Sequence, residues 1–361
     1  MIIESLELLH YRNYEKLELF FSKGINIFYG DNAQGKTNIL EALYVSATTK
    51  SHRASTDKEL IQFDKPEAHI RVHLRKKDVP HKIDMHLKRT KTKGAAIDGI
   101  PIHKSSELFG MLNIIFFSPE DLGIIKNGPG ERRRFLDLEL CQLDKIYFYN
   151  LARYNKVLKQ RNHLLKQIKF RPELEETLEI WDDQLIKYGI EIMKRREEFL
   201  VMLNEIIKEI HNHLTGGKEQ LSISYEESVC VEQFALQLRA KRANDEKQCS
   251  TTVGPHRDDI RFQVNDIDIR KYGSQGQQRT AALSLKLAEI ELVKKIIGDT
   301  PILLLDDVLS ELDNHRKNFL LGSIQEVQTM ITCTGLDEFI HSQLAINQIY
   351  EVCKGTVVQK N

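Results

Sequence analysis

Residues 25–44 read INIFYGDNAQGKTNILEALY, and the organisation of the whole chain can be worked out from this stretch. A short apolar run begins at Ile25 and stops at Gly30, and apolar residues then recur at helical spacing from Ile39 to Tyr44. The pattern predicts a strand, a loop and a helix in succession.

The loop, residues 30–37, reads GDNAQGKT and matches the phosphate-loop pattern G-x-x-x-x-G-K-[ST]. Glycines let the backbone turn its N–H groups toward phosphate oxygens, Lys36 can reach the β- and γ-phosphates, and Thr37 offers a hydroxyl to Mg²⁺. An ordinary glycine-rich turn would need neither side chain. We therefore expect ATP to bind the loop residues, which are Gly30, Asp31, Asn32, Ala33, Gln34, Gly35, Lys36 and Thr37.

Composition limits the class of protein. The chain has 361 residues, 41% of them hydrophobic, enough for two or three cores. Basic and acidic residues number 52 each, so any nucleic-acid surface must be a local patch. The five cysteines lack C-x-x-C spacing, which argues against a zinc site or a disulfide framework. Without a signal-peptide pattern or a long apolar run, the expected location is the reducing cytoplasm.

Strand and helix patterns divide the chain. Alternating apolar residues near both ends predict strands, whereas a continuous helical pattern begins at residue 127. The polar run at residues 241–250 is predicted to be a connecting loop. We therefore expect an α/β head made of residues 1–126 and 251–361, with a mainly α-helical lobe inserted at residues 127–250.

The helical lobe separates its charges. Residues 131–171 contain eleven Lys or Arg against four Asp or Glu, whereas residues 173–199 contain nine acids against four bases. One interpretation is that two helices pair through complementary charges. The other is that residues 132–134 and 156–169 form a surface for DNA phosphates. Both can hold for different residues.

Two polar turns have open roles. Residues 11–14 place Arg12 just upstream of the phosphate loop, where a guanidinium or an aromatic ring could pack on adenine. A plain polar turn is the alternative. Residues 118–121 follow a buried-looking strand and could either reach the metal of a nucleotide or simply end the strand.

Further polar residues occur late in the chain. Ser274 and Gly276 begin a predicted helix, where a hydroxyl, backbone N–H groups and the helix dipole can hold an anion, although any serine-capped helix shares this feature. An apolar strand then ends in Asp306 and Asp307. A strand-end aspartate can hold Mg²⁺ through water, and the adjacent acid can orient or deprotonate the attacking water.

The motifs follow one order: phosphate loop, helical insertion, S-x-G-Q before a helix, apolar strand with D-D, then S-x-L-D. In this order they resemble the ABC-type ATPase head of the SMC and RecF group, and within that group the chain is similar to the RecF family. The similarity covers the full length through RNY from Arg12, GKT from Gly35, NGPGERRRFLD from Asn127, KQRN from Lys159, GPHR from Gly254, SQGQ from Ser274 and LLDDV from Leu304.

These motifs give a set of expected site residues. Four are expected to be catalytic: Lys36, Asp306, Asp307 and Ser274. Besides the phosphate loop, three are expected to bind the nucleotide: Arg12, Gly276 and Gln277. Two are expected to hold Mg²⁺: Thr37 and Asp306.

The resemblance also implies a cellular role. S-x-G-Q helices in this ATPase class face the γ-phosphate held by a partner's phosphate loop, which implies an ATP-driven homodimer. The resemblance further implies binding to double-stranded DNA near gaps, work with RecO and RecR in loading the RecA recombinase, and support of replication restart and the SOS response to DNA damage. Asp307, where related proteins usually carry Glu, and Thr334, where they carry a switch His, imply slow hydrolysis.

Two alternatives share the nucleotide motifs. The ATPase subunit of an ABC transporter is disfavoured by the basic helical insertion and the missing switch His. An SMC-type structural DNA tether would need a long coiled coil, which the sequence lacks. We therefore expect an ATP-dependent DNA-binding clamp with slow, Mg²⁺-dependent ATPase activity.

Overall fold

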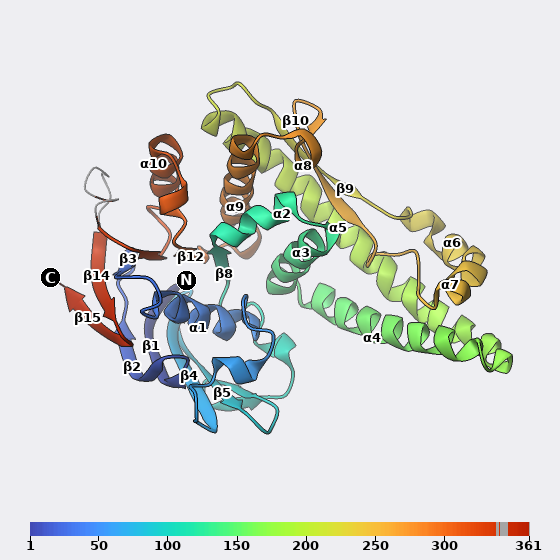
Figure 1. The fold of residues 1–361 in the computed structure, drawn as a ribbon, viewed down its shortest axis with the longest axis horizontal. Helices are drawn as coiled ribbons and strands as arrows, with labels where there is room; N and C mark the ends of the chain where they lie inside the picture. Colours follow the sequence, from blue (N-terminus) through green and yellow to red (C-terminus); the bar gives the residue numbers. More distant parts are fainter. Residues whose placement is uncertain (337–338, 340–345, 361) are drawn as a thin grey trace. The chain divides into compact units, whose positions relative to one another are not determined.

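The computed structural model describes residues 1–336, 339 and 346–360. Within these residues, no helix combines the length and the apolar character needed to cross a membrane. The chain divides into two compact units: unit 1 contains Met1–Asp121 and Leu283–Asn361, and unit 2 contains Leu122–Ala282. Each unit has its own strands and helices (Figure 1).

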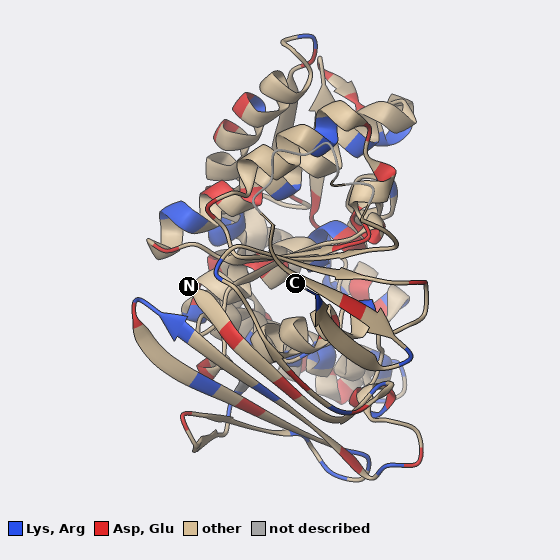
Figure 2. Ribbon diagram, turned by 90° about the vertical axis from the view of Figure 1, so that its left-hand side faces the viewer, with Lys and Arg blue, Asp and Glu red and all other residues tan. Residues whose placement is uncertain are grey.

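One sheet of unit 1 is antiparallel, with the strand order β2-β1-β4-β5-β6-β7. Its strands are β1 (Ile2–Tyr11), β2 (Tyr14–Phe20), β4 (Glu67–Lys76), β5 (Val79–Lys88), β6 (Gly94–Ile97) and β7 (Ile100–Ile102). Along β4, Ile70 and Val72 are buried, whereas His69 and Arg71 lie on the outward face. Acidic and basic residues are interspersed along the strands in Figure 2. The alternating pattern therefore predicted these long strands correctly.

The second sheet of unit 1 is mixed, with the order β15-β14-β3-β13-β12-β8. Its strands are β3 (Ile25–Tyr29), β8 (Ile114–Phe117), β12 (Ile302–Asp306), β13 (Thr329–Cys333), β14 (Ile346–Cys353) and β15 (Thr356–Lys360). Its described pairings are parallel except for the β14–β15 hairpin. Because carboxyl ends of parallel strands meet at one edge, the ends of β3, β12 and β13 lie together.

Helix α1 (Lys36–Thr48) lies between the two sheets and contacts β4 and β5 as well as β8, β12 and β13 (Figure 1). Nearly all of its residues are buried, and one hydrophobic cluster joins it to both sheets. The strand, loop and helix predicted from residues 25–44 are confirmed, and the loop between them begins at the carboxyl edge of the mixed sheet.

The remaining helical elements of unit 1 are short or shared. They are η1 (Asp57–Leu60), η2 (Ser105–Glu107), η3 (Pro119–Asp121), η6 (Leu309–Glu311), α10 (Asn314–Ser323) and the second part of α9 (Gln275–Ile297). The turn at residues 118–121 is closed by a hydrogen bond within itself, which the Asp121 carboxylate accepts from the Ser118 N–H at 2.7 Å. This carboxylate also lies 3.8 Å from the Lys286 ammonium on α9.

Unit 2 is mainly helical, as the sequence predicted. Its elements are α2 (Leu122–Lys126), α3 (Pro129–Leu143), α4 (Lys145–Ile168), η4 (Pro172–Thr177), α5 (Leu178–Leu214), β9 (Leu221–Glu226), η5 (Val231–Gln233), α6 (Phe234–Ala240), α7 (Arg242–Gln248), β10 (Asp259–Val264), β11 (Ile267–Asp268) and α8 (Ile269–Tyr272). The two long helices α4 and α5 lie side by side (Figure 1), and β9 packs on α5.

The boundaries of the inserted unit differ from those expected at residues 127–250. The compact unit begins at Leu122 and extends to Ala282, inside α9. The reason is strand pairing, because β10 is hydrogen bonded to β9 in antiparallel register and so stays with the helical unit. The polar run at residues 241–250, predicted to be a loop, contains α7 instead.

Candidate functional site

The phosphate loop is built on two glycines whose backbone conformation is rare for other residues. Gly30 has φ 146° and Gly35 has φ 115°. A Cβ atom at Gly35 would lie 2.5 Å from Nδ2 of Asn13, and one at Gly30 would collide with the carbonyl oxygen of Val352. Both glycines are therefore required by backbone geometry and by close neighbours.

Segments from both chain ends hold the loop. Nδ2 of Asn13 donates to the Gln34 carbonyl oxygen at 2.9 Å, and the Tyr14 hydroxyl donates to the Gly35 carbonyl oxygen at 3.0 Å. From the β14–β15 turn, the Lys354 N–H donates to Oε1 of Gln34 at 2.7 Å. The loop is thus fixed in shape by protein contacts on its outer side.

Lys36 points back over the loop. Its Nζ donates to the carbonyl oxygen of Asp31 at 2.8 Å and also to that of Gly30. Burial lowers the pKa of the Lys36 ammonium, and the negative charge of Asp307 opposes that effect. The ammonium is therefore held at the mouth of the loop beside an acidic group.

The threonine of the loop is hydrogen bonded to the strand-end aspartate. The Thr37 hydroxyl donates to Oδ1 of Asp306 at 2.8 Å, and the Thr332 hydroxyl donates to the same oxygen at 2.7 Å. Asp306 ends β12 and is paired with Thr332 of the neighbouring parallel strand β13. Parallel strand pairing therefore brings residues more than 250 positions apart in the chain to one point.

Asp307 follows in a strained backbone conformation with φ 55°. Its N–H donates to the Thr332 hydroxyl at 3.0 Å, and the Ser310 hydroxyl donates to its carbonyl oxygen at 2.8 Å. Burial raises the pKa of the Asp307 carboxyl, and the positive charge of Lys36 works against that rise. A carboxylate with a raised pKa accepts a proton more readily.

A cavity of about 190 Å³ collects these groups. It is lined by Asn32, Ala33, Gln34, Gly35, Lys36, Thr37, Asn38, Arg53, Asp306, Asp307 and Thr332. The structure thus brings together the phosphate loop and both strand-end acids, which the sequence had suggested as parts of one site.

Arg12 does not line this cavity, and its guanidinium is hydrogen bonded to Glu41 of α1. Its Nε and Nη2 each donate to a carboxylate oxygen of Glu41 at 2.8 Å, and its Nη1 donates to the Glu59 carbonyl oxygen at 2.9 Å. Burial alone would raise the pKa of Glu41, but hydrogen bonds from Arg12 and Ser51 and the charge of Arg53 hold it at about 2. Arg12 therefore supports α1 rather than facing the loop.

The sequence patterns missed three residues that line the cavity, Asn38, Thr332 and Arg53, and Arg53 is the charged one among them. Its Nη2 donates to Oδ1 of Asn38 at 2.9 Å and lies 3.4 Å from Oε2 of Glu41. Arg53 belongs to the irregular segment after α1, where no motif spacing distinguishes it from other exposed arginines. Only the fold shows that this cation reaches the phosphate loop.

The S-x-G-Q segment in unit 2 caps α9. The Ser274 hydroxyl accepts a hydrogen bond from the Gln277 N–H at 3.2 Å, and Oε1 of Gln277 accepts from the Ser274 N–H at 3.0 Å. Ser274 and Gly276 are exposed, and a Cβ atom at Gly276 would meet nothing nearer than the Ser274 hydroxyl oxygen at 3.8 Å. Contacts among the described residues therefore do not explain a glycine at this helix start.

The first residues of the expected DNA surface, Arg132 and Arg133, are engaged in contacts within the protein. Arg132 is only 1% exposed, and its guanidinium is bonded to both carboxylate oxygens of Asp259 at 2.5 and 3.0 Å. Arg133 is half-buried and donates to the carbonyl oxygen of Asp258 at 2.7 Å. The prediction that residues 132–134 form a phosphate-binding surface is therefore wrong for Arg132.

The lysines of α4, in contrast, are exposed. Three of them, together with Lys169 directly after the helix, form what we call the basic stripe: Lys156, Lys159, Lys166 and Lys169. Within the described residues none of the four forms a salt bridge, and α4 is joined to α5 instead by the buried Arg161–Asp182 pair at 2.6 Å. Beside the stripe lies a groove of about 390 Å³. Charge pairing between the two helices thus accounts for Arg161 but leaves the basic stripe open to solvent.

A phosphate loop at the carboxyl edge of a mainly parallel sheet, its threonine bonded to a strand-end aspartate and a second acid beside it define a P-loop ATPase head of the ABC type. The family model described as the RecF/RecN/SMC N terminal domain matches residues 2–357. The chain belongs to the RecF family of DNA replication and repair proteins.

Individual relatives support this assignment over the full length. The DNA replication and repair protein RecF of Agathobacter rectalis is 60% identical over 357 residues, which cover 99% of each chain. The protein of the same name from Lachnospira eligens is 58% identical over 363 residues, which cover 100% of each chain. A solved structure of the recombination mediator protein RecF with ATP, in the RecFOR pathway, has a TM-score of 0.93 and 36% identity, and the match covers 100% of this chain and 98% of that one.

Proposed function

We propose that this chain is an ATP-dependent DNA clamp of recombinational repair, which dimerises on ATP at gaps in double-stranded DNA and is reset by slow hydrolysis. The hydrogen bond between Thr37 and Asp306 carries the proposal, because it joins the phosphate loop to the strand-end acid in one cavity. Work with RecO and RecR in loading RecA, and support of replication restart and the SOS response, follow from the family and are part of the proposal.

The donor set of the cavity fits Mg-ATP. The Thr37 hydroxyl and the Asp306 carboxylate are hard oxygen ligands 2.8 Å apart, which suits Mg²⁺ better than a softer metal. Mg²⁺ held there would neutralise charge on the phosphates of ATP. Lys36, which also lines the cavity, adds a positive charge, and the loop N–H groups bind phosphate oxygens.

Asp307 is assigned to the attacking water. Its carboxylate lies next to the Mg²⁺-binding aspartate, and its raised pKa suits a group that accepts a proton. An aspartate reaches less far than the glutamate that related ATPases carry, and this shorter reach supports slow turnover. Arg53, which lines the cavity, adds a second cation for the phosphates.

We assign Ser274, Gly276 and Gln277 to contact with the ATP that a second copy of the chain holds in its phosphate loop. An exposed hydroxyl and an exposed glycine at the start of a long helix form a surface on which another molecule's phosphate can approach closely. ATP bound in the loop of one chain would meet this helix start on its partner. The γ-phosphate, which ADP lacks, then supplies charge-assisted hydrogen bonds that only the dimer can form.

One experiment separates the nucleotide claim from the DNA claim. Sedimentation and fluorescence anisotropy with a gapped duplex are measured without nucleotide, with ATP and with ADP. ATP is expected to produce dimers and to tighten DNA binding, and ADP is not. Lys36→Met is expected to lose both responses while keeping its DNA affinity without nucleotide. If ATP changes neither the dimer nor the DNA affinity of the wild type, the proposal is wrong.

The basic stripe is tested by charge reversal. Changing Lys156, Lys159 and Lys166 to Glu is expected to lower the dependence of log affinity on log salt by about three, since each lost phosphate contact contributes about one. The matched control reverses three exposed lysines of α5: Lys187, Lys194 and Lys208. Equal losses in both triple variants would mean a general effect of charge, and an unchanged affinity and salt slope in the α4 variant would remove α4 from the DNA surface. DNA-free ATPase should be unchanged in both variants.

A further inference from the structure

The outward face of the antiparallel sheet in unit 1 carries titratable side chains that the nucleotide site does not use. His69 on β4 and His86 on β5 are directly opposite each other in the strand register. Glu67 precedes His69 by two residues and so lies on the same face of β4. Strand pairing therefore gathers two imidazoles and a carboxylate at one place.

The distances between these groups suit a single metal ion. Glu67 Oε2 lies 2.9 Å from His86 Nε2, Glu67 Oε1 lies 3.6 Å from His69 Nε2, and one ligand atom from each residue lies within 4.8 Å of the others. Tetrahedral zinc, with bonds of about 2.0–2.1 Å, separates its ligand atoms by about 3.3 Å. The three side chains are partly exposed, so rotation about their χ angles can close the remaining gap without moving the backbone.

The imidazole rings of the two histidines lie against each other. Their rings stack with centroids 3.9 Å apart and planes inclined by 28°. Two imidazolium ions at that separation would repel each other. A neutral imidazole presents a nitrogen lone pair to a metal ion.

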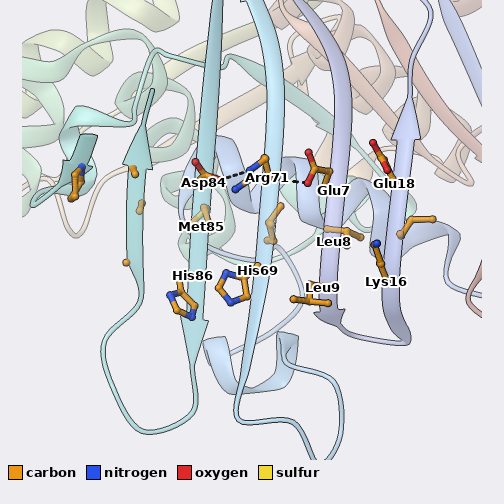
Figure 3. A pocket seen from close by; sticks show the side chains of 16 residues that line it. Glu7, Leu8, Leu9, Lys16, Glu18, His69, Arg71, Asp84, Met85 and His86 are labelled. Atoms are coloured by element: carbon orange, nitrogen blue, oxygen red, sulfur yellow. Dashed lines mark hydrogen bonds and ion pairs between the residues drawn. The ribbon is translucent and has the colours of Figure 1, made fainter. Parts of the chain in front are cut away.

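A hollow of about 590 Å³ adjoins the cluster on the same sheet face. Figure 3 shows His69 and His86 side by side in it, apart from Arg71. Arg71, which lines the same hollow, is already paired, because it lies 2.6 Å from Asp84 and 3.3 Å from Glu7. The hollow leaves room for a water molecule to complete the coordination of an ion.

We propose that Glu67, His69 and His86 bind one borderline transition-metal ion, Zn²⁺ foremost, with water in the fourth position. Two imidazoles with one carboxylate form a recognised zinc ligand set, and imidazole nitrogen favours Zn²⁺, Cu²⁺ or Ni²⁺ over Mg²⁺. The site differs in chemistry from the all-oxygen pair of Thr37 and Asp306. A bound ion would cross-link β4 to β5 and stabilise unit 1 in proportion to its occupancy.

The test uses the full chain without nucleotide and with excess Mg²⁺, added to compete with Zn²⁺ for the all-oxygen pair of Thr37 and Asp306. Titration with Zn²⁺ is expected to show one ion per chain, and Co²⁺ is expected to give visible absorption of tetrahedral type without a thiolate charge-transfer band. His86→Gln and Glu67→Gln should each weaken Zn²⁺ binding by at least about tenfold, because a lost ligand costs more than a lost supporting contact, which costs about 10- to 100-fold. Zn²⁺ should raise the melting temperature of the wild type but not of these variants.

His73→Gln is the matched control, since His73 lies on the same face of β4 and approaches Glu7 at 3.5 Å. It should bind Zn²⁺ as the wild type does. A Cys353→Ser variant removes the exposed thiol and should also bind normally. The proposal is overturned if the wild type binds no Zn²⁺, if His86→Gln and Glu67→Gln bind it as tightly as His73→Gln, or if the serine variant loses it. Circular dichroism identifies any variant that fails to fold, and His69→Gln then replaces it.

Discussion

Glu41 connects the buried core around helix α1 with a residue that lines the nucleotide cavity. Its side chain is fully buried in α1, where it bonds Arg12 at 2.8 Å and Ser51 at 2.6 Å. The Tyr11 hydroxyl lies 3.2 Å away, and Arg53 of the cavity lies 3.4 Å away. Glu41→Gln keeps the shape of the side chain and removes the charge that these groups share.

The size of the effect follows from the pKa. The Glu41 pKa of about 2, against an ordinary value of 4.5, means that the folded unit prefers the ionised carboxylate. The difference corresponds to roughly 3 kcal/mol of stability, which agrees with the usual cost of breaking a buried ion pair. Because the folded-state pKa is lowered, this stability is present above about pH 4.5 and is lost as the pH falls toward 2.

The assay is hydrogen exchange of the α1 and sheet amides of unit 1 at pH 7, which reports local unfolding even though the chain has two units. Glu41→Gln should lower the unfolding free energy by about 3 kcal/mol. It should also weaken ATP binding, because Arg53 loses the ion pair with Glu41 that helps to hold it at the cavity. Glu18→Gln, at an exposed position of β2, is the control. A difference between the two variants below about 0.5 kcal/mol would refute the reasoning.

Three further changes have defined outcomes. Burial lowers the pKa of His256 to about 4. The unfolding free energy of the wild type should therefore fall by about 3 kcal/mol relative to that of His256→Gln as the pH falls from about 6.5 to 4, measured by urea unfolding of unit 2. Parallel pH profiles of the two proteins would contradict this. Gly35→Ala places a Cβ atom 2.5 Å from Asn13 in a strained conformation, so ATP titration should show at least about tenfold weaker binding, and normal affinity would rule out the close fit. Asp307→Asn should keep ATP-dependent dimers while turnover falls at least about 100-fold. Turnover at the wild-type rate would mean that another group orients or deprotonates the attacking water.

The sequence predicted the phosphate loop because all of its parts are local. The strand, the glycines, Lys36 and the helix lie within twenty residues, and each follows from spacing or from backbone chemistry. The strand-end acids were predicted for the same reason, since an apolar run that stops at Asp306 marks a strand end in any parallel sheet. That these groups share one cavity depends on strand order, which the resemblance supplied and periodicity did not.

Other features depend on contacts between distant residues and escaped prediction. Arg132 follows Glu131 in a charged run and has the sequence pattern of a surface residue, but its partner Asp259 lies 127 positions away. The polar run that forms α7 includes Asp245, which is buried because Arg161 of α4 pairs with it at 2.8 Å. The cross-strand position of His69 and His86 required the register of β4 and β5, which alternation alone does not fix.

The central claim is that one chain supplies half of each ATP site, and a mixture of two inactive variants tests it directly. Lys36→Met removes the loop cation, and Ser274→Arg blocks the helix start. Each homodimer then has no intact site, whereas a heterodimer, isolated through different tags on the two chains, has one. ATPase activity should be near zero for each variant alone and should partly return in the heterodimer. The control is a linked dimer of wild type and Lys36→Met, which retains half the wild-type rate if one intact site is enough for activity. If that control is active and the heterodimer is as inactive as its parents, Ser274 does not act across the dimer.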